Sequence, residues 1–169
     1  MVEIPCDTHR EPGGVCQLKK ILTIVLIIAL LSITLTSCGK AFELDTNALI
    51  GDIISADLFL DSLEPVSESV VKKVVGLSTE LIKDFHYEIG TGATGEEFAV
   101  ITCDSEESAK KVKEEIIKRQ DSLYNTYEPY SPESLPRISN AVVEQKGIYV
   151  IFISCDKDDD AQKLVDKYL

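Results

Sequence analysis

The sequence contains few basic residues for its length. It has 17 Lys and Arg against 29 Asp and Glu, which gives a formal net charge of −12. Affinity for nucleic acid depends on clustered Lys and Arg side chains, so we expect no nucleic-acid partner. The same deficit disfavours electrostatic binding to anionic lipid headgroups. The simplest role of such acidity is to keep the protein in solution.

Cysteine is too scarce for a disulfide framework, since only Cys6, Cys16, Cys38, Cys103 and Cys155 are present. Cys103 and Cys155 each end a predicted strand. A bridge needs Cα atoms within about 7 Å, and equivalent ends of two hairpins are expected to lie farther apart. We therefore expect two separate, buried thiols, with a disulfide as the alternative.

Motifs that carry catalysis are also missing. The sequence has no G-x-S-x-G and no metal-ligand cluster, and His86 is the only histidine after Cys38. A Cys–His pair is disfavoured because His86 lies in a different predicted strand from either cysteine. We therefore expect no catalytic residue, no cofactor and no metal site.

Two weak motifs have simpler explanations. Residues 90–95 spell G-x-G-x-x-G, but a strand-like segment follows instead of a helix, which predicts a hairpin turn and not a dinucleotide site. The acids Asp156, Asp158, Asp159 and Asp160 lack the Gly and Glu that an EF-hand requires at loop positions 6 and 12. They predict the start of a helix.

One long apolar run, residues 21–35, follows Lys19 and Lys20. A basic pair, an apolar stretch, small residues and then Cys38 form the layout of an export signal. A membrane-spanning helix is the alternative. The 17 residues from Ile21 to Ser37 would reach about 25 Å, against about 30 Å for a bilayer core.

The residues Leu35-Thr36-Ser37-Cys38 resemble the bacterial lipobox. That resemblance implies a diacylglyceryl group on the Cys38 thiol and cleavage between Ser37 and Cys38. Two acyl chains would anchor the protein stably, whereas one would bind only marginally. A plain secretory cleavage and an uncleaved anchor are the alternatives.

We predict four parts in the chain. Residues 1–17 are polar and mixed in charge, which is unlike the start of an export signal, so we interpret them as an extension from a mis-called start codon. Residues 18–37 are the predicted lipoprotein signal peptide and residues 38–44 a tether. Residues 45–169 form one predicted α+β domain.

That domain begins with predicted helices over residues 46–59 and from Ser67 to Gly76. Two ββα repeats follow at an offset of 52, with "CDSEESAKK" from Cys103 over "CDKDDDAQK" from Cys155. They predict a four-stranded antiparallel sheet with both repeat helices on one face. The prolines of residues 125–139 predict an irregular connection between the repeats.

Two surfaces are candidates for binding. "YVIFIS" is apolar on both sides, which predicts that part of residues 46–76 covers the second sheet face, or that this face is an exposed patch for a partner. Tyr124, Tyr127 and Tyr130 recur at intervals of three. They indicate that the aromatic rings pack a loop against the helix end, and binding of a glycan or peptide is the alternative.

From about residue 42 to 169 the chain resembles a family of small bacterial lipoproteins of unknown function, common in Gram-positive bacteria. The stretches that carry the resemblance are "YEIGTGATGEEFAVITCDS", "YSPESLP" and "ISNAVVEQKGIYVIFISCD". The resemblance implies export and lipidation. It implies no activity and no catalytic residues.

These features predict a lipid-anchored envelope protein whose domain lies on the extracytoplasmic side of the cell membrane. The lipid on Cys38 would contact the membrane, and the domain would bind a protein or glycan without catalysing a reaction. An enzyme acting on envelope polymers or peptides is the alternative. It would require a cleft that gathers two or more ionisable residues.

Overall fold

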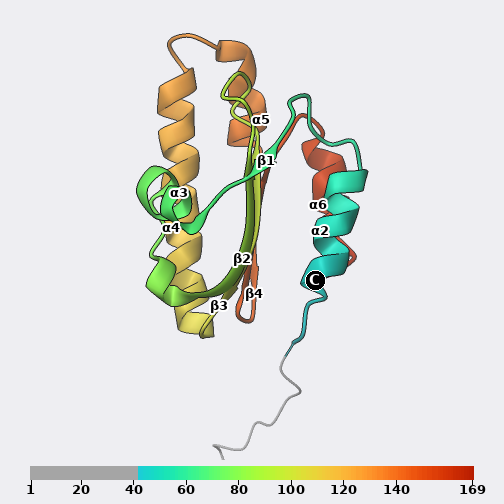
Figure 1. Ribbon diagram of the computed structural model, residues 1–169. Coiled ribbons are helices and arrows are strands. Elements are labelled where there is room, and N and C mark those ends of the chain that lie inside the picture. Colours follow the sequence, from blue (N-terminus) through green and yellow to red (C-terminus); the bar gives the residue numbers. More distant parts are fainter. Residues whose placement is uncertain (1–41) are drawn as a thin grey trace, which may run out of the picture. The chain divides into compact units, whose positions relative to one another are not determined.

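An antiparallel sheet of five strands lies at the centre of residues 42–169, the part of the chain that the computed structural model describes (Figure 1). The strand order is β1-β2-β3-β5-β4. The bounds are Glu64–Pro65 for β1, Ile82–Ile89 for β2, Glu97–Cys103 for β3, Val142–Lys146 for β4 and Tyr149–Ser154 for β5. The α+β class and the antiparallel sheet are as predicted. The predicted count of four strands is wrong, because the short β1 adds a fifth.

The predicted signal peptide, the cleavage site between Ser37 and Cys38 and the lipid on Cys38 lie outside the described residues, so they stay predictions. Within residues 42–169, no helix has the length and apolar character needed to cross a membrane.

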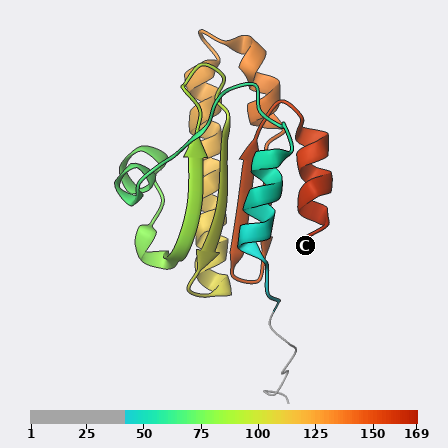
Figure 2. The same cartoon turned by 45° about the vertical axis from the view of Figure 1, so that its right-hand side comes forward.

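Helices cover both faces of the sheet. The long helix α4 (Glu106–Tyr127) packs on one face together with the π-helical turn η2 (Val71–Val75). Helices α2 (Thr46–Ser55) and α6 (Asp158–Asp166) lie side by side on the other (Figure 2). We call these the α4 face and the α6 face.

Strand β5 shows why both faces are covered. Val150 and Phe152 are buried on the α4 face, and Tyr149, Ile151 and Ile153 are buried on the α6 face. A strand that is apolar on both sides requires cover on both. Of the two arrangements that the sequence left open, the covered sheet is the observed one, with α2 as part of the cover.

The two repeat helices lie on opposite faces, so the prediction that they share a face is wrong. Phe98 of β3 pairs with Ile153 of β5, and paired residues of antiparallel strands point to the same face. The repeat equivalent of Phe98, however, is Val150, which lies three positions before Ile153. Because side chains alternate along a strand, an odd separation turns Val150 to the other face. The helices of the two repeats, α4 and α6, therefore pack on opposite faces of the sheet.

Helix α2 begins as predicted, because the Ala48 N–H donates to the Asp45 carboxylate at 3.0 Å. It ends at Ser55, four residues earlier than expected. Asp57 adopts the left-handed region with φ 50°, which breaks the helix. Leu60 consequently lies outside the helix and is 62% exposed.

The second predicted helix is present as α3 (Glu68–Val70) running into η2, and Gly76 ends it with φ 88°. The 3₁₀ turn η3 (Thr79–Leu81) then leads into β2.

The connection after α4 is not the irregular loop that its prolines predicted. It contains a 3₁₀ turn, η4 (Pro132–Ser134), and a short helix, α5 (Leu135–Ser139), and it buries Ile138. Proline is compatible with a first helical turn, because the N–H it lacks would have no partner there.

The described chain begins at the turn between β4 and β5. The ring of Phe42 meets the ring of Tyr149 edge-on, with 6.0 Å between centroids. The Lys146 ammonium lies 4.4 Å from the centroid of the Phe42 ring. This pair of contacts fixes the start of the domain at one end of the sheet.

Candidate functional site

The glycine-rich residues 90–96 form the loop between β2 and β3, as the hairpin prediction required. Gly92 and Gly95 have φ of 92° and 72°, a conformation that other residues rarely adopt. A dinucleotide site would need a helix directly after this loop, and the chain continues as strand β3 instead.

Two carboxylates hold this loop against the segment that follows α2. The buried Glu96 accepts the backbone N–H groups of Leu60 and Asp61 at 2.8–3.1 Å. Asp61 in turn accepts the N–H and the hydroxyl of Thr91, both at 2.8 Å. Burial opposes the charge on Asp61, but these hydrogen bonds outweigh it and lower the pKa of the carboxyl. Residues 60–62 are thereby fixed beside the loop.

Residues of α4 and β5 also hydrogen-bond to the loop. The Tyr127 hydroxyl donates to the Gly92 carbonyl at 2.8 Å, and the Ser154 hydroxyl donates to the Gly95 carbonyl at 3.1 Å. Packing of Tyr127 is therefore as predicted, whereas Tyr130 is 60% exposed. The loop joins β2, β3, α4 and β5 at one end of the sheet.

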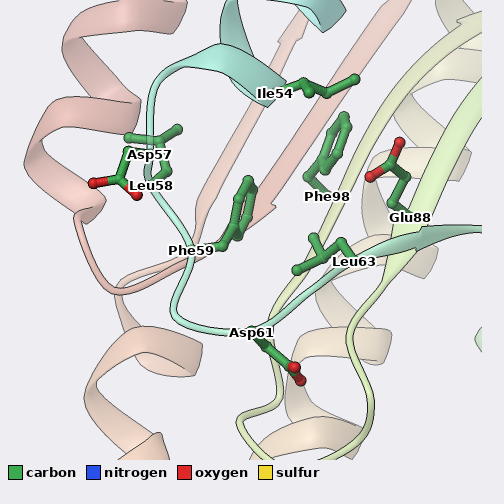
Figure 3. A pocket seen from close by; sticks show the side chains of 8 residues that line it. All are labelled: Ile54, Asp57, Leu58, Phe59, Asp61, Leu63, Glu88 and Phe98. Carbon is green, nitrogen blue, oxygen red and sulfur yellow. The ribbon is translucent and has the colours of Figure 1, made fainter.

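A hollow of about 210 Å³ opens beside this junction on the α6 face (Figure 3). The segment after α2 forms one wall, and β2 and β3 form the floor. Its lining residues are Ile54, Asp57, Leu58, Phe59, Asp61, Leu63, Glu88 and Phe98. In Figure 2, α2 and α6 stand over one side of the sheet and leave β2 beside them, which is why the face is open here.

Aromatic rings form the back of the hollow. Phe59 stacks on Phe98 with 5.7 Å between ring centroids and 28° between planes. The His86 ring also lies near Phe98, with 5.3 Å between ring centroids. Phe98 is fully buried, whereas Ile54 at the rim is 56% exposed. The hollow thus has a rigid apolar back and an apolar rim in contact with solvent.

Glu88 is the one carboxylate of the lining that sits deep in the hollow. It pairs with Phe98 across the sheet, so its side chain points to the same face as that ring. The residue is 8% exposed. Its Oε1 lies 2.7 Å from Nε2 of His86, and within residues 42–169 no partner contacts its Oε2.

The other two carboxylates of the lining turn away from the hollow, as Figure 3 shows. Asp57 points toward α6, where Lys157 contacts its Oδ2 at 2.9 Å. Asp61 points toward the glycine-rich loop and Thr91. Each of these carboxylates has a partner outside the hollow, but Asp61 still places a negative charge beside the hollow without a described Lys or Arg contact.

The α4 face has a contrasting arrangement of charge. Glu97 is 2% exposed and forms a two-point ion pair with Arg119 of α4, with Nε to Oε2 at 3.2 Å. The Tyr87 hydroxyl donates to the same carboxylate at 2.8 Å. Burial and the neighbouring Glu97 raise the pKa of Tyr87 well above its ordinary value. Burial opposes the charge on Arg119, but Glu97 raises the pKa of the guanidinium.

The two cysteines are free and fully buried, so the prediction of separate thiols is confirmed. Cys103 lies in the core of the α4 face and Cys155 in that of the α6 face. Burial raises the pKa of Cys103 to about 11 and that of Cys155 to about 12. Neither thiol is poised to act as a nucleophile near neutral pH.

The acidic run begins helix α6 as predicted, with Asp158, Asp159 and Asp160 in its first turn. Asp156 instead lies 3.5 Å from Arg137. Within residues 42–169, no group of three or more His, Cys, Asp or Glu side chains is placed to hold a metal ion.

Sequence reasoning missed the hollow. Its lining combines residues 54–63 with one residue each from β2 and β3, and Phe59 had been assigned to a helix. The signal available was "GEEF", in which two adjacent acids stand at the start of a largely apolar strand. The structure sends Glu96 and Glu97 to opposite faces, one onto backbone N–H groups and one onto Arg119.

Comparison with protein families matches residues 56–155 to a family described as a domain of unknown function (DUF4358). The matched stretch is more than half of the chain and includes all the strands and helix α4. It includes every residue that lines the hollow except Ile54. No curated protein and no solved structure matches the chain.

Proposed function

The chain belongs to the DUF4358 family, and from that premise we propose that it is a lipid-anchored envelope protein whose domain binds a partner through the hollow on the α6 face. Binding is proposed to occur without catalysis, on the extracytoplasmic side of the cell membrane. The partner is a protein or a glycan of the envelope.

The support for anchoring comes from the sequence. Two lysines, an apolar run and the lipobox-like residues 35–38 stand in the order that lipoprotein export requires. Modification of Cys38 with two acyl chains would give stable attachment to a membrane.

The support for binding is the hollow itself, which is the observation that carries the proposal. Its back is rigid, because stacked rings and a carboxylate network fix Phe59 and residues 60–62. Ile54 of the lining is 56% exposed, and Leu60, which lies between the lining residues Phe59 and Asp61 in the chain, is 62% exposed. Exposed apolar side chains around a preformed recess are typical of a surface that contacts a partner.

The chemistry of the hollow favours binding over catalysis. His86 and Glu88 form a histidine–carboxylate pair, which is one half of an acid–base arrangement. Within residues 42–169, however, no Ser, Thr or Cys side chain hydrogen-bonds to His86. Nucleophilic catalysis would need such a group within about 3 Å of the imidazole.

Site-directed photo-crosslinking in intact cells tests the binding proposal. A photoreactive amino acid at Leu60 should give a discrete crosslinked product. The same amino acid at Ile117 is the matched control, because Ile117 is a 41% exposed apolar residue on α4, on the opposite face of the sheet. Equal products from both positions, or none from Leu60, would contradict the proposal.

Substitution Cys38→Ala tests the anchor separately. Labelled fatty acid should enter the wild-type protein and not the variant, and the variant should leave the membrane fraction or remain unprocessed. Equal labelling of both proteins would exclude lipidation at Cys38.

A further inference from the structure

The hollow contains one free hydrogen-bond acceptor in an apolar setting. Glu88 is 8% exposed, its Oε1 contacts His86, and within residues 42–169 its Oε2 has no partner. Glu88 Oε2 is not among the buried side-chain atoms of residues 42–169 that lack a hydrogen-bond partner, so it reaches the solvent of the hollow and is open to a donor or a cation. The free oxygen therefore indicates what the hollow is suited to receive.

The walls beside that oxygen are hydrocarbon. Phe59 and Phe98 present stacked rings, and Leu63 and Ile54 complete the surround. Aliphatic stems pack on such rings, and a cation near a ring face gains further attraction from the ring quadrupole. A group with a methylene stem and a positive end fits both parts of the hollow.

The surrounding charge has the same sign as Glu88. The lining includes three carboxylates and no Lys or Arg. Lys157 offsets Asp57 from outside the hollow, while hydrogen bonds from Thr91 lower the pKa of Asp61 and keep it ionised. With a chain net charge of −12, the local and the overall field both attract a cationic ligand.

We propose that the hollow receives a lysine side chain of a partner protein, with its methylene stem on Phe59 and Phe98 and its ammonium at the free oxygen of Glu88. This inference rests on the proposed binding function and assigns the chemical class of the partner.

Two observations favour lysine over arginine and over a larger ligand. A guanidinium binds a carboxylate best through two parallel hydrogen bonds, and His86 already occupies one oxygen of Glu88. The compact ammonium of lysine needs only one carboxylate oxygen, and Oε2 of Glu88 supplies it. The volume of about 210 Å³ lies below the range of roughly 300–1,000 Å³ that is usual for pockets binding whole small molecules, so a single side chain is the better match.

Ligand-observed NMR on the full chain in uncharged detergent tests the proposal. The probes are N-acetyl-lysine, N-acetyl-norleucine and N-acetyl-arginine methylamides, which share one backbone and differ at the side-chain end. The lysine probe should bind with about tenfold lower Kd than the norleucine probe, in line with a hydrogen bond between charged groups. Equal binding of these two probes, or tighter binding of the arginine probe, would overturn the assignment.

The substitution Glu88→Gln keeps the shape of the side chain and should remove the preference for lysine. Glu144→Gln on edge strand β4 is the control, because it deletes one equivalent charge away from the hollow and should keep the preference. A lysine preference that survives in the Glu88 variant would place the site elsewhere.

The outcomes separate this inference from the proposed function. A crosslink at Leu60 without a lysine preference would refute the lysine assignment and leave the binding role standing. A lysine preference without any crosslink at Leu60 would contradict the binding role in the cell.

Discussion

The two faces of the sheet manage buried charge in different ways. On the α4 face, one helix of 22 residues covers the strands, and the buried Glu97 is matched by Arg119 and Tyr87. On the α6 face, helices of ten and nine residues leave β2 open, and one oxygen of the mostly buried Glu88 has no partner among residues 42–169.

The contrast indicates which face is built for stability and which for contact with other molecules. A satisfied network costs little to keep and much to break. The free oxygen of Glu88 is open to solvent, so a donor from another molecule can reach it. The predictions below test this division of roles, from the largest effect to the smallest.

The largest effect is expected from Arg119→Met. The substitution leaves Glu97 buried without its cation, which typically costs about 3–5 kcal/mol. The free energy of unfolding, measured by urea denaturation, should fall by that amount.

Two further variants check this cause. Adding Glu97→Gln to Arg119→Met should recover much of the loss, because the uncompensated charge is gone. Lys111→Met, which removes an ion pair between exposed side chains of α4, should leave stability unchanged. If Arg119→Met behaves like Lys111→Met, the α4 face does not depend on its buried pair.

The buried thiols, one on each face, should make the fold sensitive to alkaline pH. Both folded pKa values lie above the ordinary value of 9.0, so between pH 9 and about 11 the unfolded chain binds fewer protons than the folded one. Stability is therefore fully present below pH 9 and falls as pH rises, by about 1.4 kcal/mol per pH unit for each thiol.

Urea denaturation at several pH values measures this dependence. Cys103→Ala should remove the part of the pH-dependent loss of stability that ends near pH 11. Cys155→Ala should remove the part that ends near pH 12. A double variant with the same pH profile as the wild type would show that the thiols are not responsible.

The smallest effects are expected from two glycines. Gly95→Ala should destabilise by about 1–3 kcal/mol, because φ is 72° and the added methyl group would lie 2.8 Å from Ile138. Gly51→Ala should stabilise by about 0.5–1 kcal/mol, since Gly51 lies within α2 with open space around it. Thermal unfolding measures the change in stability of both variants. If Gly95→Ala stabilises the protein as Gly51→Ala does, the conformational role of Gly95 is contradicted.

Much of the fold could be predicted from local pattern. The four long strands, the three main helices and the stop at Gly76 follow from alternation, helical periodicity and the preference of glycine for positive φ. The early end of α2 could not be predicted, because it depends on Asp57 adopting φ 50° near Lys157, a residue 100 positions away.

The placement of the repeat helices shows a different limit. The two repeats have similar sequences, but this similarity does not reveal on which face of the sheet each repeat helix packs. The face depends on the register between β3 and β5. A shift of one residue would have put α4 and α6 on the same face. The hollow exists because the α6 face carries two short helices, so it could not be predicted from the sequence either.

The contact of Phe42 with Tyr149 and Lys146 has a consequence for how the domain would stand on a membrane. If Cys38 carries the lipid, as we propose, only three residues separate it from Phe42, and so short a chain reaches at most about 14 Å. The β4–β5 turn would then lie close to the bilayer surface. Tyr149 pairs with Thr102 at that end of the sheet, whereas Phe98 pairs with Ile153 near the other. The hollow lies toward the opposite end of the sheet from that turn, where lipid bound at Cys38 would not compete with a second molecule.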